Sequence, residues 1–403
     1  MILPANKSYG ICILQSLFRE VSLCPKALVE GEKMNYNHEN LRVLYIGAGL
    51  GYDGSSKMLS YTVKELNSIF KNVFILVHDL EKNKAFKHEN ETILYYEDYK
   101  AQVAPSSPIK RLLNYIRIMK AIRNTVIKNS IDVAIVFTAN KMVLAKLALI
   151  NWKGKLIGAE RGAPHTKKKF WIILSKILFP KYDGLVFQTK KAQDFYGEKI
   201  KAISTVIPNP YIVKGEEIKP YFGLREKSIV SAGRLCRDKG FDILIDAFSV
   251  LSKRYPEYKL YIYGEGPEKE KLQKQIENLN LCDKAFLCGF TENVAKSIRK
   301  DGIFVLSSRT EGIPNVLLEA MGVGIPCVAT NCASGGPAML LKNNERGILA
   351  EPNSVDSLVN SIAYLIDNPE VANELGKRAA EAMKEFSYDK VFEQWKKFIL
   401  SKL

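Results

Sequence analysis

The chain contains little histidine and no paired cysteine motif. Its 403 residues include 4 histidines (His38, His78, His88 and His165), and none of them lies near a cysteine at the spacing of a zinc site. The 7 cysteines are scattered and form no Cys-x-x-Cys pair. We therefore expect no structural zinc and no disulfide framework, and we interpret the cysteines as reduced core thiols of a cytosolic protein.

Long hydrophobic runs are also missing. No apolar run approaches the roughly 20 residues that a membrane-spanning helix needs. The stretch Gly10–Leu23 is interrupted by Gln15, Arg19 and Glu20 and lacks a convincing cleavage site, so no signal peptide is predicted. Residues 1–40 precede the first clear strand and are expected to form a poorly ordered N-terminal extension, with Met34 as a second candidate start.

What the sequence does have is an ordinary globular composition, 47% hydrophobic and 25% charged. This composition excludes a disordered protein, a collagen-like protein and a polytopic membrane protein. At roughly 100–200 residues per domain, two domains are expected, with three as the alternative.

The net charge of +16 is one-sided. Up to Lys219 the chain has 34 lysines and arginines against 19 acidic residues, whereas from Pro220 onward the counts are 25 and 24. A basic N-terminal half indicates an anionic partner such as a membrane surface, nucleic acid or a phosphorylated substrate. A generally lysine-rich composition is the alternative, but it does not explain the asymmetry. No helix-turn-helix, zinc-finger or aromatic RNA-binding signature occurs, so we expect no nucleic acid.

Two stretches concentrate the positive charge. Residues 99–131 contain no acidic residue and carry apolar side chains at helical spacing, which predicts an amphipathic helix. In Lys167–Lys181, lysines are interleaved with Phe170, Trp171 and aliphatic side chains, a pattern that suits the headgroup layer of a membrane. The alternative for this segment is a core helix with a solvated lysine edge.

Short apolar runs alternate with helical stretches along most of the chain, which predicts parallel sheets covered by helices on both faces. The pattern gives an N-terminal domain (41–212), a linker (213–225), a C-terminal domain (226–385) and a last helix in 386–403 that is expected to cross back. Two such domains facing each other form a crevice at the carboxyl ends of their strands, where ligands bind. The predicted strands are 41–48, 73–78, 92–96, 132–137, 155–160 and 184–188, then 228–232, 260–263, 285–287, 302–306, 327–330 and 347–349.

A glycine-rich loop follows the first predicted strand. Gly49, Gly51 and Gly54 match Gly-x-Gly-x-x-Gly, and Asp79 follows about 25 residues later, as in the dinucleotide fingerprint. The backbone amides of such a loop bind pyrophosphate at a helix N-terminus. Taken alone, the loop favours a nicotinamide- or flavin-dependent oxidoreductase, although glycine turns at this position also serve other phosphate-binding proteins.

The C-terminal half places two cations beside a helix start. Arg234 and Lys239 come just after a predicted strand, and the helix that follows Gly240 points its N-terminus at the same place. This combination forms a pyrophosphate site. A solvated turn with two ordinary basic residues fits the spacing equally well.

A second motif contains Glu311 and Glu319, separated by seven residues. Gly312 and Pro314 predict a tight turn and Asn315 a helix start, so the amides of Gly312, Ile313, Asn315 and Val316 would point into the crevice. A carboxylate accepts hydrogen bonds strongly and can grip two adjacent sugar hydroxyls. The alternative for Glu319 is an exposed helical glutamate, but its apolar neighbours favour a partly buried position with a partner.

Together these motifs resemble family 4 glycosyltransferases, which have the GT-B fold, an α/β architecture of two Rossmann-like domains facing each other across a central cleft. The similarity covers most of residues 41–400 and is strong in the second half and weak in the first. It rests on the glycine loop and on Val206–Pro210, Gly233-Arg234 with Lys239-Gly240, Tyr263–Pro267, Gly289–Thr291, Glu311–Glu319, Ser334–Pro337 and Phe386–Tyr388.

The resemblance implies a retaining transfer of a hexose or N-acetylhexosamine from a nucleotide diphosphate sugar, without a divalent metal or another cofactor. It implies that Arg234 and Lys239 hold the diphosphate and that Glu311 holds the sugar, all three with catalytic roles. No Asp-x-Asp pair, the usual metal motif of nucleotide-sugar enzymes, occurs, and Met339 stands where relatives carry an acidic residue, so no role is carried over there. The other donor-binding residues that it implies are Gly264, Gly266 and Phe290 near the base, Gly312, Ile313, Pro314, Asn315 and Val316 at the sugar, and Glu319 at the ribose.

On the acceptor side we expect Gly49, Gly51, Gly54, Arg161 and His165, with a plain surface histidine as the alternative for His165. The stretch at 334–337 resembles enzymes that use UDP-sugars. The expected acceptor is a lipid-linked or growing cell-surface glycan of polysaccharide, lipopolysaccharide or capsule biosynthesis. The expected location is the inner face of the plasma membrane, with peripheral attachment. The alternatives are the oxidoreductase and a nucleotide-sugar epimerase of similar fold.

Overall fold

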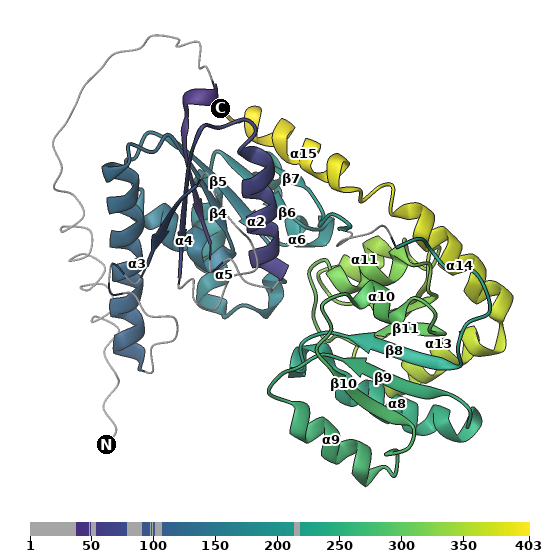
Figure 1. The fold of residues 1–403 in the computed structure, drawn as a ribbon. Helices are drawn as coiled ribbons and strands as arrows, with labels where there is room; N and C mark the ends of the chain where they lie inside the picture. Colours follow the sequence, from purple (N-terminus) through teal and green to yellow (C-terminus); the bar gives the residue numbers. More distant parts are fainter. Residues whose placement is uncertain are drawn as a thin grey trace, which may run out of the picture.

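A computed structural model of the chain describes residues 38–47, 49, 54–78, 91–96, 98, 100, 107–212 and 218–403. Most of the expected N-terminal extension, Gly51, Asp79 and part of the expected linker lie outside the described residues. The described residues form two α/β lobes that face each other (Figure 1).

The N-terminal lobe is built on a seven-stranded parallel sheet in the order β3-β2-β1-β4-β5-β6-β7. Its central strands are buried on both faces and rich in valine and isoleucine, as expected for a parallel sheet covered by helices. The strands are β1 (Arg42–Ile46), β2 (Asn72–Val77), β3 (Thr92–Tyr95), β4 (Val133–Phe137), β5 (Lys155–Glu160), β6 (Gly184–Phe187) and β7 (Ser204–Val206).

Different helices cover the two faces of this sheet. Helices α3, α4 and α5 share one apolar core with it, and α2 and α15 share the other. Ser107 caps α3 by accepting a hydrogen bond from the amide of Lys110 at 3.2 Å, and Pro108 occupies the first helical position. The helical segments of this lobe are η1 (His38–Asn40), α2 (Gly54–Leu66), α3 (Pro108–Lys128), α4 (Ala139–Ala148), η3 (Pro164–Thr166), α5 (Lys169–Leu178), η4 (Phe179–Lys181), α6 (Lys190–Asp194) and α7 (Glu198–Lys201).

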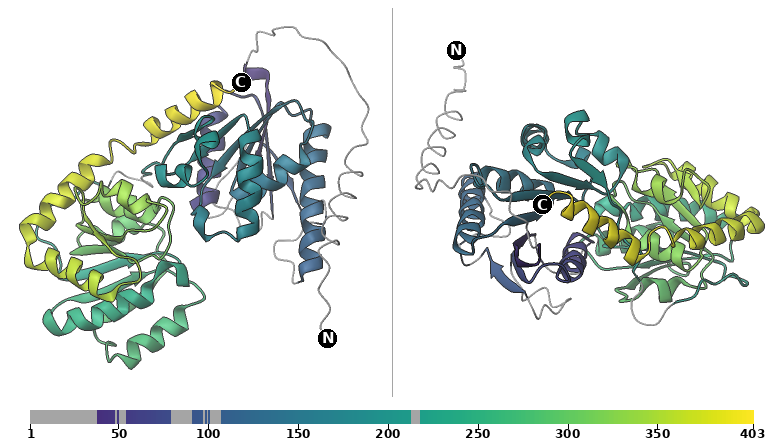
Figure 2. Two further views of the ribbon diagram at one scale, coloured as in Figure 1. Left: turned by 180° about the vertical axis from the view of Figure 1, so that it is seen from behind. Right: turned by 90° about the horizontal axis from the view of Figure 1, so that it is seen from above.

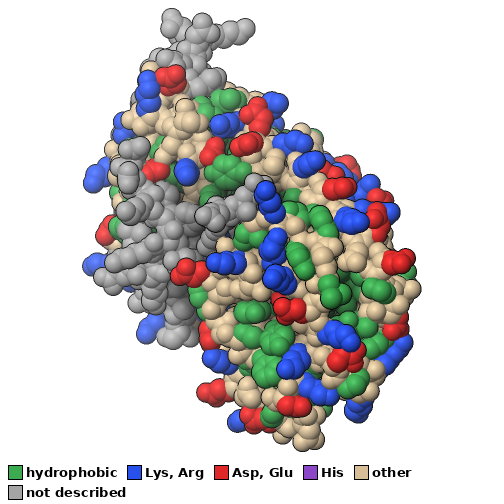
Figure 3. All heavy atoms as spheres, turned by 45° about the vertical axis from the view of Figure 1, so that its right-hand side comes forward, with side chains coloured by type: hydrophobic (Ala, Val, Ile, Leu, Met, Phe, Trp, Pro, Cys, Tyr) green, Lys and Arg blue, Asp and Glu red, His purple; other side chains and the backbone are tan. Residues whose placement is uncertain are grey.

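The C-terminal lobe holds a six-stranded parallel sheet in the order β10-β9-β8-β11-β12-β13. Its strands are β8 (Ser228–Ala232), β9 (Lys259–Tyr263), β10 (Ala285–Gly289), β11 (Ile303–Leu306), β12 (Cys327–Thr330) and β13 (Ile348–Ala350). Its helical segments are η5 (Arg237–Lys239), α8 (Phe241–Arg254), α9 (Lys269–Asn278), α10 (Val294–Ile298), α11 (Asn315–Gly322), α12 (Gly336–Leu340), α13 (Val355–Asp367) and α14 (Pro369–Ala382). Acidic and basic side chains are interspersed over the face of this lobe seen in Figure 3, in keeping with its balanced charge.

The last helix, α15 (Tyr388–Leu400), leaves the C-terminal lobe and packs on the N-terminal one (Figures 1 and 2). Four of its side chains, including Trp395, join the core formed by α2 and the first sheet. The chain passes between the lobes twice, once after β7 and once before α15. The two segments lie side by side, because the amide of Tyr211 donates to the carbonyl of Phe386 at 2.7 Å. The lobes are therefore connected twice at one place.

The predicted fold of two parallel α/β sheets is confirmed, and the predicted strands agree with the observed ones to within two residues at each end. The sequence analysis missed β7, whose three residues Ser204–Val206 are too few to show a periodic pattern. The prediction that the cysteines are core thiols was wrong in part, since Cys282 and Cys288 are exposed. Strand β10 lies at the edge of its sheet, which leaves Cys288 open to solvent. No helix in the described part of the chain is both long and apolar enough to cross a bilayer.

Candidate active site

A cleft of about 780 Å³ lies between the lobes, where the carboxyl ends of both sheets meet. Most of the residues proposed for the donor line it: Arg234, Lys239, Gly264, Phe290, Glu311, Gly312, Ile313, Pro314, Asn315, Val316 and Glu319. The N-terminal lobe adds Lys57, Met58, Tyr61, Arg161, Gln188 and Asn209. The structure thus brings residues from distant parts of the sequence into one cavity.

Two basic side chains, Arg234 and Lys239, line the cleft near the start of α8. Arg234 is exposed and forms no ion pair with any described residue. Lys239 ends the short helix η5 and forms an ion pair with Glu311, with the two side chains 24% and 11% exposed. Gly240 follows with a φ of +64°, a left-handed conformation that turns the chain directly into α8. Arg234 and the helix N-terminus are thus available to an anion in the cleft, and Lys239 lies beside them in its ion pair with Glu311.

Hydrogen bonds from Arg309 hold the turn that carries Lys239. Its guanidinium donates two hydrogen bonds of 2.7 Å to the carboxylate of Asp242 and one of 2.7 Å to the carbonyl of Arg237. Burial alone would raise the pKa of Asp242, but the hydrogen bonds and charge of Arg309 lower it overall. The hydrogen bond to Asp242 in turn raises the pKa of Arg309. This bidentate pair fixes the backbone of the cation turn.

The loop between β11 and α11 is held from both lobes. Ser308 donates a 2.9 Å hydrogen bond to the Glu311 carboxylate, and the Ser334 hydroxyl donates to the Glu311 carbonyl. Gly312 lies so close to the N-terminal lobe that a Cβ atom there would sit 2.1 Å from Oε1 of Gln188. Any larger residue at 312 would therefore displace the carboxamide of Gln188.

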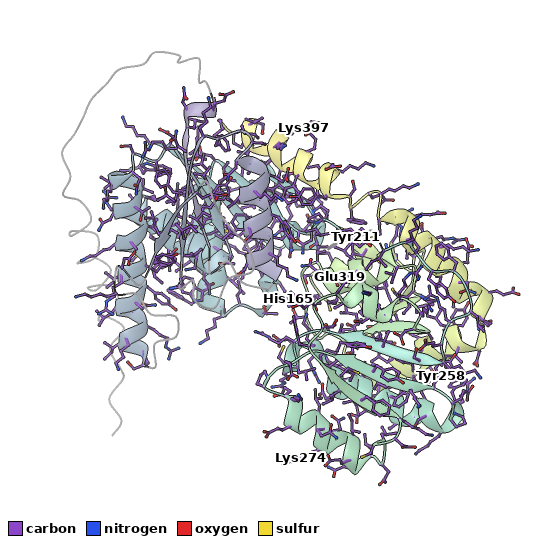
Figure 4. All side chains as sticks on the ribbon, in the orientation of Figure 1. His165, Tyr211, Tyr258, Lys274, Glu319 and Lys397 are labelled. Carbon is purple, nitrogen blue, oxygen red and sulfur yellow. The ribbon has the colours of Figure 1, made fainter. Side chains whose placement is uncertain are left out.

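Glu319 lies one turn inside α11, near the N-terminal lobe (Figure 4). It lines the cleft together with Tyr61 of α2. Burial raises the pKa of Tyr61, and the negative charge of Glu319 raises it further. Phe290 is 65% exposed and forms part of the cleft wall together with Gly264. Gly266 lies behind this wall, against the backbone of Leu235.

The residues expected on the acceptor side are more dispersed. Arg161 lines the cleft but is buried, and its guanidinium donates to Asn209 and to the carbonyl of Ile207. Burial lowers the pKa of Arg161 to about 9, so the side chain stays charged at neutral pH. His165 is exposed on the rim and is not among the cleft-lining residues, and burial lowers its pKa somewhat (Figure 4). Gly49 is buried, Gly51 lies outside the described residues, and Gly54 begins α2.

Sequence reasoning missed several cleft residues of the N-terminal lobe. Gln188 and Asn209 each lie just beyond the carboxyl end of a strand, β6 and β7 respectively, where side chains reach the cleft. Extending the strand-end rule to β6 would have found Gln188. Asn209 was out of reach of that rule because β7 itself was missed. Lys57 and Tyr61 face the cleft from the first turns of α2.

Comparison with known proteins assigns the family. The model of the family "Glycosyl transferases group 1" matches residues 216–382. An uncharacterized glycosyltransferase of Haemophilus influenzae is 32% identical over 319 residues, which cover 78% of this chain and 87% of that protein. The chain is a group 1 (GT4) glycosyltransferase.

Two further relatives place this glycosyltransferase among proteins of known activity and structure. A Campylobacter jejuni α-1,4-N-acetyl-D-galactosaminyltransferase, named for an undecaprenol-diphosphate-linked acceptor, is 24% identical and covers 89% of this chain and 98% of its own. The crystal structure of Anabaena HepE with UDP and glucose superposes with a TM-score of 0.71 at 17% identity, over 90% of this chain and 100% of that one. The GT-B fold is thereby confirmed, and the oxidoreductase alternative drawn from the glycine loop is set aside.

Proposed function

We propose that this glycosyltransferase transfers a hexose or N-acetylhexosamine from a UDP-sugar, with retention of configuration, to a lipid-linked or growing cell-surface glycan. The observation that carries the proposal is the single cleft in which Arg234 and Lys239 lie beside the loop of Glu311 and the helix of Glu319. The uridine nucleotide is supported by the UDP bound to HepE and by the stretch at 334–337.

Different groups of residues are proposed to bind different parts of the donor. Arg234, Lys239 and the N-terminus of α8 hold the diphosphate, Glu319 holds the ribose, and Gly264, Gly266 and Phe290 lie toward the base. Glu311 and the amides of Gly312, Ile313, Asn315 and Val316 hold the transferred sugar. Lys239 and Glu311 neutralise each other in the unliganded protein, and a bound donor gives each a new partner, phosphate for the lysine and sugar hydroxyls for the glutamate.

The chemistry follows from where charge develops. The bond between the anomeric carbon and the diphosphate oxygen breaks, the acceptor oxygen bonds to that carbon, and the acceptor proton leaves with the diphosphate. Positive charge builds on the sugar ring while negative charge builds on the leaving group. Fixed cations and amides aimed at the diphosphate stabilise that transition state. The acceptor is proposed to enter from the side of Arg161, His165 and the loop at Gly49–Gly54.

We also propose that the enzyme acts while attached to an anionic membrane. The basic segments form α3 and α5, and the ring contact of 5.3 Å between Tyr115 and Trp171 joins the two helices. Their N-termini lie at the carboxyl edge of the sheet, which is the edge that faces the cleft. A bilayer on this surface would lie next to the proposed entrance for a lipid-linked acceptor. The large apolar side chains exposed on these two helices are Ile109, Leu112, Leu113, Ile127, Phe170, Ile173 and Ile177.

A nucleotide screen tests the donor proposal. Thermal unfolding is measured with UDP, ADP, GDP and NAD at equal concentrations, and UDP is expected to raise the melting temperature most because ligands stabilise the state that binds them. Radiolabelled UDP-sugars and undecaprenol-diphosphate glycans then test transfer. Protection by NAD alone would overturn the proposal. Conversion of a UDP-sugar to its epimer without any acceptor would replace the proposed transferase with an epimerase.

Flotation on vesicles tests the membrane proposal separately. The double variant Phe170→Ser/Ile173→Ser is expected to lose at least tenfold in partitioning to phosphatidylglycerol vesicles, since each apolar side chain is worth about 1.5–3 kcal/mol when fully buried. Val250→Ser is the matched control, because Val250 on the C-terminal lobe is 48% exposed and Ile173 is 49% exposed. Equal partitioning of wild type to neutral and anionic vesicles would contradict the charge argument.

A further inference from the structure

Asn209 lies where the two lobes meet, next to the loop Glu311–Asn315 that is proposed to bind the sugar. It is 2% exposed and follows β7 in the segment that leads out of the N-terminal lobe. Its Oδ1 accepts hydrogen bonds from Gln188 Nε2 at 2.9 Å and from the guanidinium of Arg161. These two contacts fix the carboxamide to the N-terminal lobe.

The other end of the same carboxamide reaches the opposite lobe. Its Nδ2 donates to the carbonyl of Ile313 at 3.2 Å and to Oδ1 of Asn315 at 2.6 Å. Gln188 supports the contact, since its Oε1 accepts from the amide of Ile313 at 3.4 Å. The four hydrogen bonds of Asn209 are thus divided between the lobes, two on each side.

A second contact across the lobes leads to the same loop. Thr189 Oγ1 donates to the carbonyl of Ser334 at 2.5 Å, and Ser334 in turn donates to the carbonyl of Glu311. By contrast, among the described residues the backbone of the turn at Lys239 is hydrogen-bonded to Arg309 and Ser307, which both belong to the C-terminal lobe. The turn is linked to the loop Glu311–Asn315 by the ion pair between Lys239 and Glu311. The backbone of the cation turn is therefore fixed within its own lobe, whereas the loop Glu311–Asn315 also depends on the other lobe.

We propose that Asn209 is a positioning residue that ties the loop Glu311–Asn315 to the N-terminal lobe, so that this loop is set for sugar transfer only while the lobes are closed. The proposal rests on the proposed function for its effect on transfer. When the lobes separate, Ile313 and Asn315 lose their partner and the loop loses its alignment, while the diphosphate site keeps its shape. A nucleotide sugar would then be bound by its diphosphate without being positioned for reaction.

Asn209→Asp is the sharpest variant because it changes one end of the carboxamide and leaves the other. The new carboxylate still accepts from Arg161 and Gln188 but has no hydrogen to donate. Asn315 can turn its amide to donate to the carboxylate, but the carbonyl of Ile313 cannot. The contact to the Ile313 carbonyl is thereby broken without a change in side-chain size.

Gln193→Glu is the matched control. Gln193 is also buried in the N-terminal lobe, and its Nε2 donates at 2.8 Å to the hydroxyl of Ser204, which can donate in return. The same amide-to-acid change is therefore made in the same lobe, away from the cleft.

Hydrogen exchange and kinetics are measured on both variants. In Asn209→Asp, amide exchange is expected to rise in residues 311–316 and to stay unchanged in 234–240. The kcat for transfer is expected to fall about 100-fold, as for a misplacement of about 1 Å, while Kd for UDP changes less than about threefold. Unchanged exchange in 311–316, or equal effects of Gln193→Glu, would overturn the proposal. If wild type fails to bind UDP, the proposed function fails, and the exchange data still decide whether Asn209 holds the loop.

Discussion

The ion pair between Lys239 and Glu311 allows catalysis and stability to be separated by mutation. Lys239→Ala removes a cation aimed at the leaving diphosphate, and loss of one such preorganised group costs about 10²–10³ in turnover. It also leaves the Glu311 carboxylate, which is 11% exposed, with Ser308 as its remaining side-chain donor among the described residues. The variant should therefore lose both activity and stability.

The size of the stability loss follows from the exposure of the pair. Exposed ion pairs contribute less than about 1 kcal/mol, and breaking a fully buried one costs about 3–5 kcal/mol. With side chains 24% and 11% exposed, Lys239→Ala should lower the free energy of unfolding by about 1–2 kcal/mol. In a lobe of this size that lowers the melting temperature by about 2–4 °C per kcal/mol.

Two companion variants make the test decisive. Adding Glu311→Gln to Lys239→Ala should restore most of the stability, because a neutral amide still accepts from Ser308, but should restore no activity. Arg234→Ala should lose a similar factor in turnover with less than about 0.5 kcal/mol of stability, because Arg234 is exposed and has no ion-pair partner among the described residues. Calorimetry and a radiolabelled-sugar transfer assay measure the two quantities. Turnover of Lys239→Ala within about threefold of wild type would refute the assignment.

Two further changes test the support of the C-terminal lobe. Burial raises the pKa of Asp301 to about 6, so its ionised form at neutral pH destabilises the folded state. Asp301→Asn keeps an acceptor for the Ser228 hydroxyl and should stabilise the protein by about 1–2 kcal/mol at pH 7.5. In urea unfolding, this gain in stability should shrink as the pH falls through 6 and vanish below about 4, the pKa of the aspartate in the unfolded state. Below that pH the aspartic acid of the wild type and the asparagine of the variant are both neutral. A gain that persists at pH 3.5 would exclude the buried charge as its cause. Arg309→Gln loses the bidentate contact to Asp242 that fixes the cation turn. The variant should raise Kd for UDP about tenfold, with the fold intact by circular dichroism. An unchanged Kd would show that the turn keeps its conformation without Arg309.

The motifs of the C-terminal lobe meet at the cleft, and their placement could be predicted because their geometry is local. Lys239, Gly240 and the start of α8 are neighbours in sequence, and so are Glu311, Gly312 and the start of α11. A strand end followed by a glycine turn and a helix start leaves few conformations open. The side chains that such a unit presents to the cleft can therefore be named from the sequence.

The N-terminal side of the cleft could not be predicted in the same way. Arg161 follows a strand end as expected, yet its guanidinium turns into the junction between the lobes, where Asn209 and Ile207 accept from it. Asn209 was noted only as part of a turn. Its role as a contact between the lobes depends on residues that lie 104 and 106 positions away in the sequence.

By itself, the sequence determined the two parallel sheets, the one-sided charge and the motifs that carry the basic and acidic side chains of the second half, because apolar periodicity and turn residues act over a few neighbours. The tertiary structure alone decided how the lobes face each other, that α15 packs beside α2, and which buried amide spans the junction. Those features depend on contacts between segments more than 100 residues apart, and no local pattern encodes which distant partner a buried polar group will find.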